Sequence, residues 1–322
     1  MERPNVRLSI KSIKDLTINI NLASLLELAG WPKPGNVHRT QDFQDTKFEH
    51  FLAGIAAIQP SFKSLSEKIY QSSYKNDKDY RSIGLGLYYK NAAKEMMKWQ
   101  GGGNVLLGHI LLLVPLAAAG TLCLQQNMLK IEDFKNFLRK IIDESTVEDT
   151  LNLYEAIRTC NPGGLGKIEK YDINNENSFK EIRADKINLK KIFEISKEYD
   201  LISSEYSTGF SIILDEGLPY FLNTFNQFHN LNIATVNTYL KILSEHLDTL
   251  VIRKSGREAA IHITKTAKNI LRHGGISSEK GLKLAFKLDA ELQEKNGNLN
   301  PGSTADLLAG IIFCALIFGL RI

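Results

Sequence analysis

Apolar residues recur at intervals of three and four along most of the 322-residue chain. From Phe48 through Ile55 to Ile69 they follow one face of a helix, with polar residues between them. The same spacing predicts further helices at 15–30, 82–99, 105–127, 131–143, 146–158, 186–199, 232–250, 257–272, 278–296 and 304–320. Alternation typical of strands is scarce, and residues 201–229 show no clear period. We therefore predict an all-α fold of about ten helices.

Two of these segments, 105–124 and 305–320, are apolar on every side. The first is about as long as a membrane span. His109, Pro115 and Asp306 interrupt the two runs, no basic cluster flanks the first, and the mean hydropathy of the chain is −0.17. We therefore predict two buried central helices rather than membrane spans.

Composition favours one globular domain over residues 1–322, with 43% apolar and 24% charged residues. The most polar segment, 169–186, is predicted to be an exposed loop. A net charge of +4 permits anionic ligands, but no long Lys/Arg run indicates a nucleic-acid partner. Three widely separated cysteines and the absence of a signal-peptide pattern favour the cytoplasm. The two apolar helices could also form the interface of a homodimer.

Several helix starts are marked by capping residues. "TKFE" (46–49) and "STVE" (145–148) read as capping boxes, with Thr46 and Glu49 as the N-cap and N3 residues of the first. "GGGN" (101–104) and "NPGSTAD" (300–306) place Asn104 and Ser303 as N-caps of the two apolar helices, with Asp306 at N3 of the second. A helix start that follows glycine binds phosphate well, although glycine and asparagine also simply form loops and caps.

The loop "WPKPGNVH" (31–38) is stiffened by two prolines and is expected to present Lys33 to a phosphate, together with Arg39. Asp42 and Asp45 stand three residues apart before a helix. They could hold Mg²⁺ together with substrate phosphates, or be helix-start anions. His38 could transfer a proton or cap the loop.

A second basic segment, "DTLVIRKSGRE" (248–258), gathers Arg253, Lys254 and Arg257 around Gly256, with Asp248 nearby. It could clamp a polyphosphate or be a charged helix junction. "NPGGLGKIE" (161–169) fails the P-loop pattern, because Asn161 replaces the first glycine and Ile168 replaces the required Ser or Thr.

Read together, four segments resemble, in order and spacing, the triphosphoribosyl-dephospho-CoA synthase family over roughly residues 20–310. The segments are "ELAGWPKPGNVHRTQDFQDTKFEHFLAG", "GGGNVLLGHILLLVPLAAAG", "DTLVIRKSG" and "NLNPGSTADLLAG". The family's Asn-Thr-His-Lys-Gly reads Asn-Val-Leu-Leu-Gly at 104–108, and its Arg slot holds Lys254. The chain is similar to a divergent, archaeal-type branch.

The resemblance implies an all-helical enzyme of cofactor biosynthesis that transfers the triphosphoribosyl group of ATP to 3′-dephospho-CoA or a related acceptor, with Mg²⁺ and release of adenine. It implies contacts to the nucleotide from Lys33, Gly35, Asn36, Gly103, Asn104, Gly108, Lys254, Pro301, Gly302 and Ser303. It implies Asp45 and Asp306 as metal ligands. It implies a base that deprotonates the acceptor, for which Asp42, Asp248 and His38 are the candidates, with Asp306 as another.

Two alternatives keep the fold and change the function. One is phosphoribosyl-type transfer in another cofactor pathway, and the other is a helical nucleotide-binding protein without catalysis. No residue stands out in the sequence as the group that protonates the leaving purine.

Overall fold

The computed structural model describes residues 7–72, 79–166 and 168–322, and within them every regular element is helical. Isolated bridges join Arg7 to Lys130 and His38 to Gln41, but no strand forms in these ranges. The prediction of an all-α fold is confirmed. The helices are α1 (Ile13–Ala29), α2 (Phe48–Gln71), α3 (Leu85–Trp99), α4 (Leu107–Gln126), α5 (Ile131–Asp143), α6 (Val147–Cys160), α7 (Ser178–Ala184), α8 (Leu189–Ser196), α9 (Leu201–Thr208), α10 (Leu218–Phe228), α11 (Leu231–Glu245), α12 (Thr249–Ser255), α13 (Arg257–Arg272), α14 (Glu279–Gln293) and α15 (Gly302–Ile317).

Shorter turns complete the path: η1 (Tyr80–Ile83) and η3 (Gly275–Ser277) are 3₁₀ turns, and η2 (Ile212–Gly217) is π-helical. The segment 201–229, which had no clear period, contains α9, η2 and α10. The predicted helix 232–250 is wrong as one unit, because the Asp248 side chain caps a new helix, α12. The predicted polar loop at 169–186 contains the short helix α7.

Three predicted caps are also wrong. The N-cap of α2 is Lys47, whose amide donates to His50 Nδ1 at 3.0 Å, so Thr46 and Glu49 do not form a box. The box of α6 is shifted by one residue, from Ser145 to Thr146. The N-cap of α15 is Pro301 rather than Ser303, which lies inside the first turn.

Asn104 does cap α4, from outside the helix, because its Oδ1 accepts the Leu107 amide at 3.1 Å. Its position differs from the predicted one, since the N-cap residue by backbone geometry is Leu106. The loop 101–104 therefore ends in a side-chain cap, as expected, but the helix begins later.

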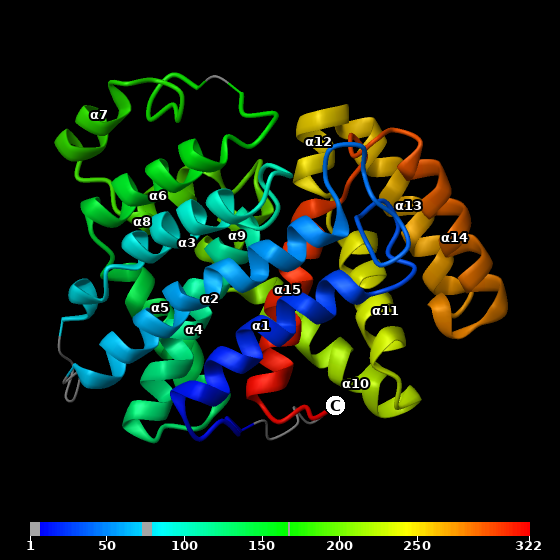
Figure 1. Cartoon of the computed structure of the whole chain (residues 1–322), viewed down its shortest axis with the longest axis horizontal. Helices are drawn as coiled ribbons and strands as arrows, with labels where there is room; N and C mark the ends of the chain where they lie inside the picture. The colour runs from blue at the N-terminus through cyan, green and yellow to red at the C-terminus, as the bar shows by residue number, and fades with distance from the viewer. Residues whose placement is uncertain (1–6, 73–78, 167) are drawn as a thin grey trace.

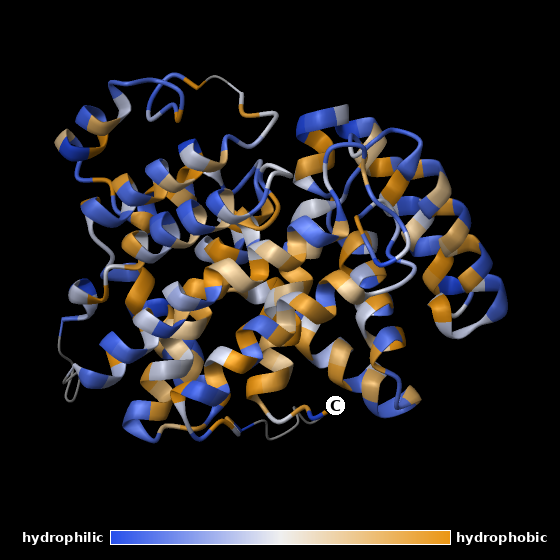
Figure 2. Ribbon diagram, in the orientation of Figure 1, coloured by the Kyte–Doolittle hydropathy of each residue, from blue (hydrophilic) through white to orange (hydrophobic). Residues whose placement is uncertain are grey.

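Helices α4 and α15 form the centre of the fold, as predicted from their apolar sequences. Residues Leu307 to Ile317 of α15 are all buried, against α1, α4, α10 and α11. Helix α4 is long and apolar enough to cross a membrane, and 94% of its most apolar window is buried inside the protein. In Figure 2 the apolar colouring is concentrated on these central helices, and outer helices carry a polar face. Neighbouring helices therefore cover both apolar segments.

Figure 1 shows α3, α6, α8 and α9 on one side of the molecule and α11, α13 and α14 on the other, with α1 and α15 between them. The two sides meet at the start of α15. There the Thr304 amide donates to Asp248 beside α12, and Asp306 contacts His109 of α4. The fold thus brings the starts of α4, α12 and α15 together at the end of α1.

We expect Gly86→Ala to destabilise the protein strongly. Gly86 of α3 packs on the α6 backbone, where an added Cβ would lie 2.3 Å from the Asp149 carbonyl oxygen. Forcing these helices apart should lower the free energy of unfolding by about 3 kcal/mol, despite the better helix propensity of alanine. Urea denaturation measures this. Gly163→Ala, with no heavy atom within 4 Å of the new Cβ, is the control, and equal losses in both variants would contradict the packing argument.

Candidate active site

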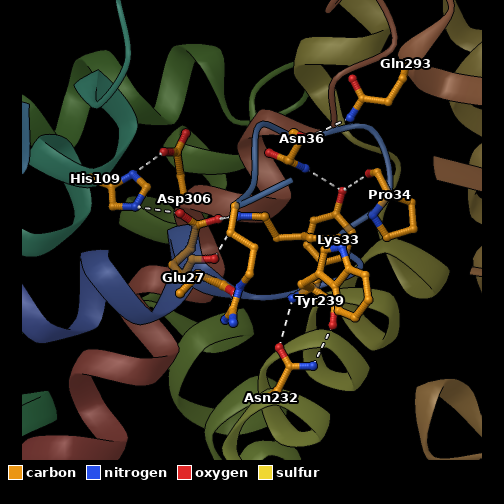
Figure 3. Close-up of polar contacts among 12 residues, drawn as sticks. Glu27, Lys33, Pro34, Asn36, His109, Asn232, Tyr239, Gln293 and Asp306 are labelled. Carbon is orange, nitrogen blue, oxygen red and sulfur yellow. Dashed lines mark hydrogen bonds and ion pairs between the residues drawn. The ribbon is translucent and has the colours of Figure 1, made fainter. Parts of the chain in front are cut away.

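Four ionisable side chains with alternating charge form a buried chain at the meeting point of α1, α4 and α15 (Figure 3). The Lys33 ammonium donates to the Glu27 carboxylate and, at 2.8 Å, to the Glu27 carbonyl. The second Glu27 oxygen lies 3.4 Å from His109 Nε2, and His109 Nδ1 lies 2.8 Å from Asp306 Oδ1. We call these four residues the charge chain. The side chain of Asp306 is 19% exposed, whereas the other three are exposed by 3% or less.

Local structure explains why these residues meet. Glu27 lies in the last turn of α1, and the loop that follows folds back so that Lys33 reaches it. Gly108 lets α15 approach α4, because an added Cβ there would lie 1.9 Å from Asp306 Oδ2. Glycine at this position is therefore required for the His109–Asp306 contact.

The partners within the charge chain decide its protonation states. Burial alone would lower the pKa of His109, but the carboxylates of Asp306 and Glu27 outweigh it and raise the pKa to about 9. Burial would raise the pKa of Glu27, and the Lys33 ammonium, with His109, outweighs it and lowers the pKa. Burial raises the pKa of Asp306, against the opposing effect of His109. At neutral pH, His109 is therefore an imidazolium between carboxylates.

The loop 31–38 is fastened to α11 by side-chain hydrogen bonds, also drawn in Figure 3. Asn36 Nδ2 donates at 2.7 Å to the Tyr239 hydroxyl, which donates at 2.8 Å to the Pro34 carbonyl. Trp31 and Asn232 exchange two further bonds. The loop is therefore a fixed wall of the site.

Helix α14 holds the same loop from the other side. Asp289 accepts the Gly35 amide at 3.0 Å and lies 2.9 Å from His38 Nε2. Gly35 has φ +78°, and an added Cβ would lie 2.8 Å from Leu292 and 3.0 Å from Pro301. Gly35 is therefore needed both for its backbone conformation and for the close approach of loop and helix.

Asp248 ties α12 to α15. One carboxylate oxygen accepts the amides of Leu250 and Val251, at 2.9 and 3.1 Å, and the other accepts the amide and hydroxyl of Thr304, at 2.7 and 2.8 Å. Burial raises its pKa, and these bonds oppose the shift. Nearby, the Ser303 hydroxyl lies 3.0 Å from that of Thr249. The geometry therefore favours a structural role for Asp248.

The basic residues of α12 lie at the edge of this region. Arg253 donates to Asp200 at 3.1 Å, and Lys254 donates to the Gly297 carbonyl at 3.1 Å. Burial and the neighbouring Arg253 lower the pKa of Lys254. Gly164 packs against Arg253, so the loop that fails the P-loop pattern borders the same region.

Most of the predicted site residues are in one neighbourhood, but several side chains point elsewhere than expected. Lys33 is 1% exposed and pairs with Glu27, so the expectation that the loop presents it to a phosphate is wrong for this conformation.

His38 is buried against Asp289, and Asp42 accepts the Phe48 amide at 2.8 Å, as a helix-start anion does. Asp45 is exposed.

The remaining predicted residues lie around the starts of α4 and α15. Gly103 and Asn104 are exposed on the loop before α4, and Gly108 lies in its first turn. Pro301 and Gly302 begin α15, where Gly302 packs on Leu250 of α12. Contact with a nucleotide stays a prediction for these residues.

Sequence reasoning missed Glu27, Asp289 and the role of His109. Asp289 stands in a helix among other charged residues, where nothing separates a buried carboxylate from a solvated one. Glu27 is the one charged residue between Asp15 and Lys33, in the largely apolar stretch "NLASLLELAG", so its isolation was a signal that went unused. His109 had a visible signal, since an ionisable residue inside an otherwise apolar run must find a buried partner.

The oxygen and nitrogen donors around the site determine how Mg²⁺ could be held. Within residues 7–72, 79–166 and 168–322, the group of three ligands close enough to enclose a metal is Glu216, Glu245 and His246, none of them a predicted site residue. The region around the charge chain thus offers scattered carboxylates instead of a cage. Such a donor set fits Mg²⁺ that arrives on substrate phosphates and keeps its waters.

Comparison with known proteins gives consistent matches. The family model of CitG, ATP:dephospho-CoA triphosphoribosyl transferase, matches residues 13–321. A crystal structure from Archaeoglobus fulgidus, provisionally described as a triphosphoribosyl-dephospho-CoA synthase, aligns with a TM-score of 0.64 and 31% identity, over 85% of this chain and 100% of that one.

Two curated relatives carry the provisional name 2-(5''-triphosphoribosyl)-3'-dephosphocoenzyme-A synthase. The protein from Salmonella gallinarum is 30% identical over 33% of this chain, and that from Citrobacter koseri is 31% identical over 35%. These alignments span only about a third of the relatives' own length, 34% and 37%.

Replacement of His109 should change how stability depends on pH. Its folded pKa of about 9 exceeds the ordinary value of 6.5, so its contribution is complete below about pH 6.5 and is lost as the pH rises through 9. Between these limits the free energy of unfolding of the wild type should fall by about 2–3 kcal/mol relative to His109→Gln. Urea denaturation across this range measures the difference. Parallel curves for the two proteins would show that His109 is not charged in the fold.

Proposed function

Because the chain belongs to the CitG family of ATP:dephospho-CoA triphosphoribosyl transferases, we propose that it transfers the triphosphoribosyl group of ATP to a hydroxyl of 3′-dephospho-CoA, or of a closely related acceptor, and releases adenine. The family match over residues 13–321 carries this proposal. Its substrates would be intracellular nucleotides, which is consistent with the expected cytoplasmic location.

The arrangement of helix starts supports a polyphosphate ligand. Helices α4 and α15 both begin at the site, after loops rich in glycine or proline, and their first turns carry the positive end of the helix dipole. Arg253 and Lys254 add positive charge at the same edge. We infer that the triphosphate lies between the start of α4 and α12.

Lys33 has a different role in this account from the one its sequence suggested. Its ammonium is enclosed by Glu27, so it holds the loop 31–38 against α1 and supports the wall of the site. Phosphate binding is left to residues with exposed side chains or amides.

The reaction is a displacement at C1′ of the ribose. The bond from C1′ to the adenine N9 breaks with its electron pair on the purine, and the acceptor hydroxyl oxygen forms the new bond. Positive charge develops on the sugar, as in glycoside hydrolysis. Water must be excluded, because it would compete with the acceptor for C1′. A site that lies against the apolar helices α4 and α15 suits this requirement.

For Mg²⁺ we propose Asp45 as the protein ligand. It is exposed, and no other described side chain pairs with it. When bound with ATP, the cation would neutralise charge on the phosphates. Asp45 and the exposed amides of the glycine loop would then orient the nucleotide.

Incubation with ATP, Mg²⁺ and 3′-dephospho-CoA should release adenine in amounts equal to the triphosphoribosylated product, measured by chromatography and mass spectrometry. Adenine release should require the acceptor, because the enzyme must suppress hydrolysis. The matched control is the 2′-deoxy acceptor, which lacks the hydroxyl that the family is expected to use. No adenine with a panel of dephospho-CoA-like acceptors, despite ATP binding by calorimetry, would contradict the proposed transfer.

Asp45→Asn should raise the Mg²⁺ concentration needed for half-maximal activity by about tenfold, since one charged oxygen ligand is lost. Asp42→Asn is the comparison, because Asp42 caps α2 through one oxygen. Magnesium titrations of initial rate measure both. An unchanged requirement in Asp45→Asn would remove Asp45 from the metal site.

A further inference from the structure

The candidates for the base that deprotonates the acceptor differ in how many of their hydrogen-bonding positions the protein already occupies. Asp248 accepts four hydrogen bonds from the protein, two on each oxygen. His38 is buried between Asp289 and Thr40. Asp42 caps α2.

Among the described residues, no donor hydrogen-bonds Asp306 Oδ2, although Oδ1 is held by His109. Asp42 also has an oxygen without a hydrogen bond from the described residues, but that oxygen faces the Lys47 ammonium at 3.9 Å. Asp306 is therefore the largely buried carboxylate with an oxygen to spare, beside the glycine loop.

On the basis of the proposed function, we propose that Asp306 accepts the proton of the acceptor hydroxyl, and that His109 is the positioning residue that aims Asp306 Oδ2 at it. In this account His109 does not touch the substrate, because its side chain is 3% exposed. It acts through Asp306.

The charge chain explains how His109 can orient Asp306. The imidazole is held at both nitrogens, by Asp306 at 2.8 Å and by Glu27 at 3.4 Å. His109 Nε2 has no aligned hydrogen bond, so the contact with Glu27 is one of charge. Glu27 is itself held by Lys33. The ring therefore has one favourable orientation, and the Nδ1 contact fixes the Asp306 carboxylate.

Gly108 provides an independent constraint on the same oxygen. An added Cβ would lie 1.9 Å from Asp306 Oδ2 and 2.2 Å from its carboxyl carbon. Asp306 therefore occupies space that only glycine leaves open, in the first turn of α4. A base placed there sits beside the glycine loop at which we locate the nucleotide.

The step balances without a further reactant. The hydroxyl proton passes to Asp306 Oδ2 as the oxygen bonds to C1′, and the C1′–N9 pair leaves with adenine. Adenine takes up one proton from solvent, and Asp306 later returns one to solvent.

Two substitutions of His109 separate orientation from charge. Asparagine places an amide nitrogen close to the former Nδ1 position and can still donate to Asp306, whereas glutamine places it close to Nε2, toward Glu27. Both remove the charge. We expect His109→Asn to retain kcat within about threefold of wild type and His109→Gln to lower it about 100-fold, with KM for ATP nearly unchanged in both.

Gly108→Ala tests the same oxygen without altering any ionisable group. It should lower kcat at least about tenfold by displacing Asp306. Gly120→Ala on the same helix is the control, since the tightest contact of its Cβ would be a Leu16 methyl at 3.1 Å, with Phe134 and Ile317 at ordinary distances of 3.8 and 3.9 Å. Its kcat should match wild type. Circular dichroism of every variant verifies folding.

The outcomes separate this inference from the proposed function. A wild type that releases no adenine would refute both. An active wild type with equal losses in His109→Asn and His109→Gln, or with no loss in either, would overturn the positioning role alone. A Gly108→Ala variant as active as Gly120→Ala would overturn the placement of Asp306 as the base.

Discussion

The attraction between Lys33 and Glu27, buried at the end of α1, is the constraint on which the rest of the site depends. A carboxylate removed from water costs several kcal/mol even after relaxation, unless a partner of opposite charge is held against it. Glu27 has two such partners, Lys33 and His109. The loop 31–38 must therefore close on α1, and α4 must present His109 to the same point.

Further structure follows from this pairing. His109 carries the alternation of charge to Asp306 on α15, and Gly108 leaves the space that this contact needs. The loop closed by Lys33 is then fixed by Tyr239 and Asp289. The end of α1 with its loop, the start of α4 and the start of α15 are distant in sequence, and these contacts join them into one rigid unit. Of the four residues of the charge chain, only Asp306 is appreciably exposed. Rigidity of this kind is what a site needs to hold a carboxylate in one orientation.

Periodicity predicted most of the fold because burial of an apolar face sets helix position. Helices α5 and α13 match their predicted ranges, and α4 and α15 are central as their apolar sequences indicated. The predicted N-cap positions were displaced by one or two residues. Neighbouring Ser, Thr, Lys and Asp residues can each cap a helix, and tertiary packing determines which of them does. The segment 232–250, predicted as one helix, is interrupted between α11 and α12. The interruption depends on the contact of Asp248 with Thr304, which lies 56 residues further along the chain.

The motifs identified segments that meet in the fold, but side-chain direction was not predictable. Lys33, between two prolines, has the pattern of an exposed phosphate ligand, and only the position of Glu27 shows that it points inward. His109 and Asp306 are 197 residues apart, so no local spacing connects them. Resemblance to a family identifies segments that meet, and physical pairing of buried charge decides what each side chain does there.

A double-mutant cycle on the Lys33–Glu27 pair tests this central claim most directly. We predict that Lys33→Met and Glu27→Leu each lower the free energy of unfolding by about 3–5 kcal/mol, because each leaves the other member of the pair buried without its nearest opposite charge. The double variant should lose less than the sum, with a coupling of about 2 kcal/mol or more, since it leaves no orphaned member of the pair. Losses that simply add, or single variants as stable as the wild type, would contradict the account.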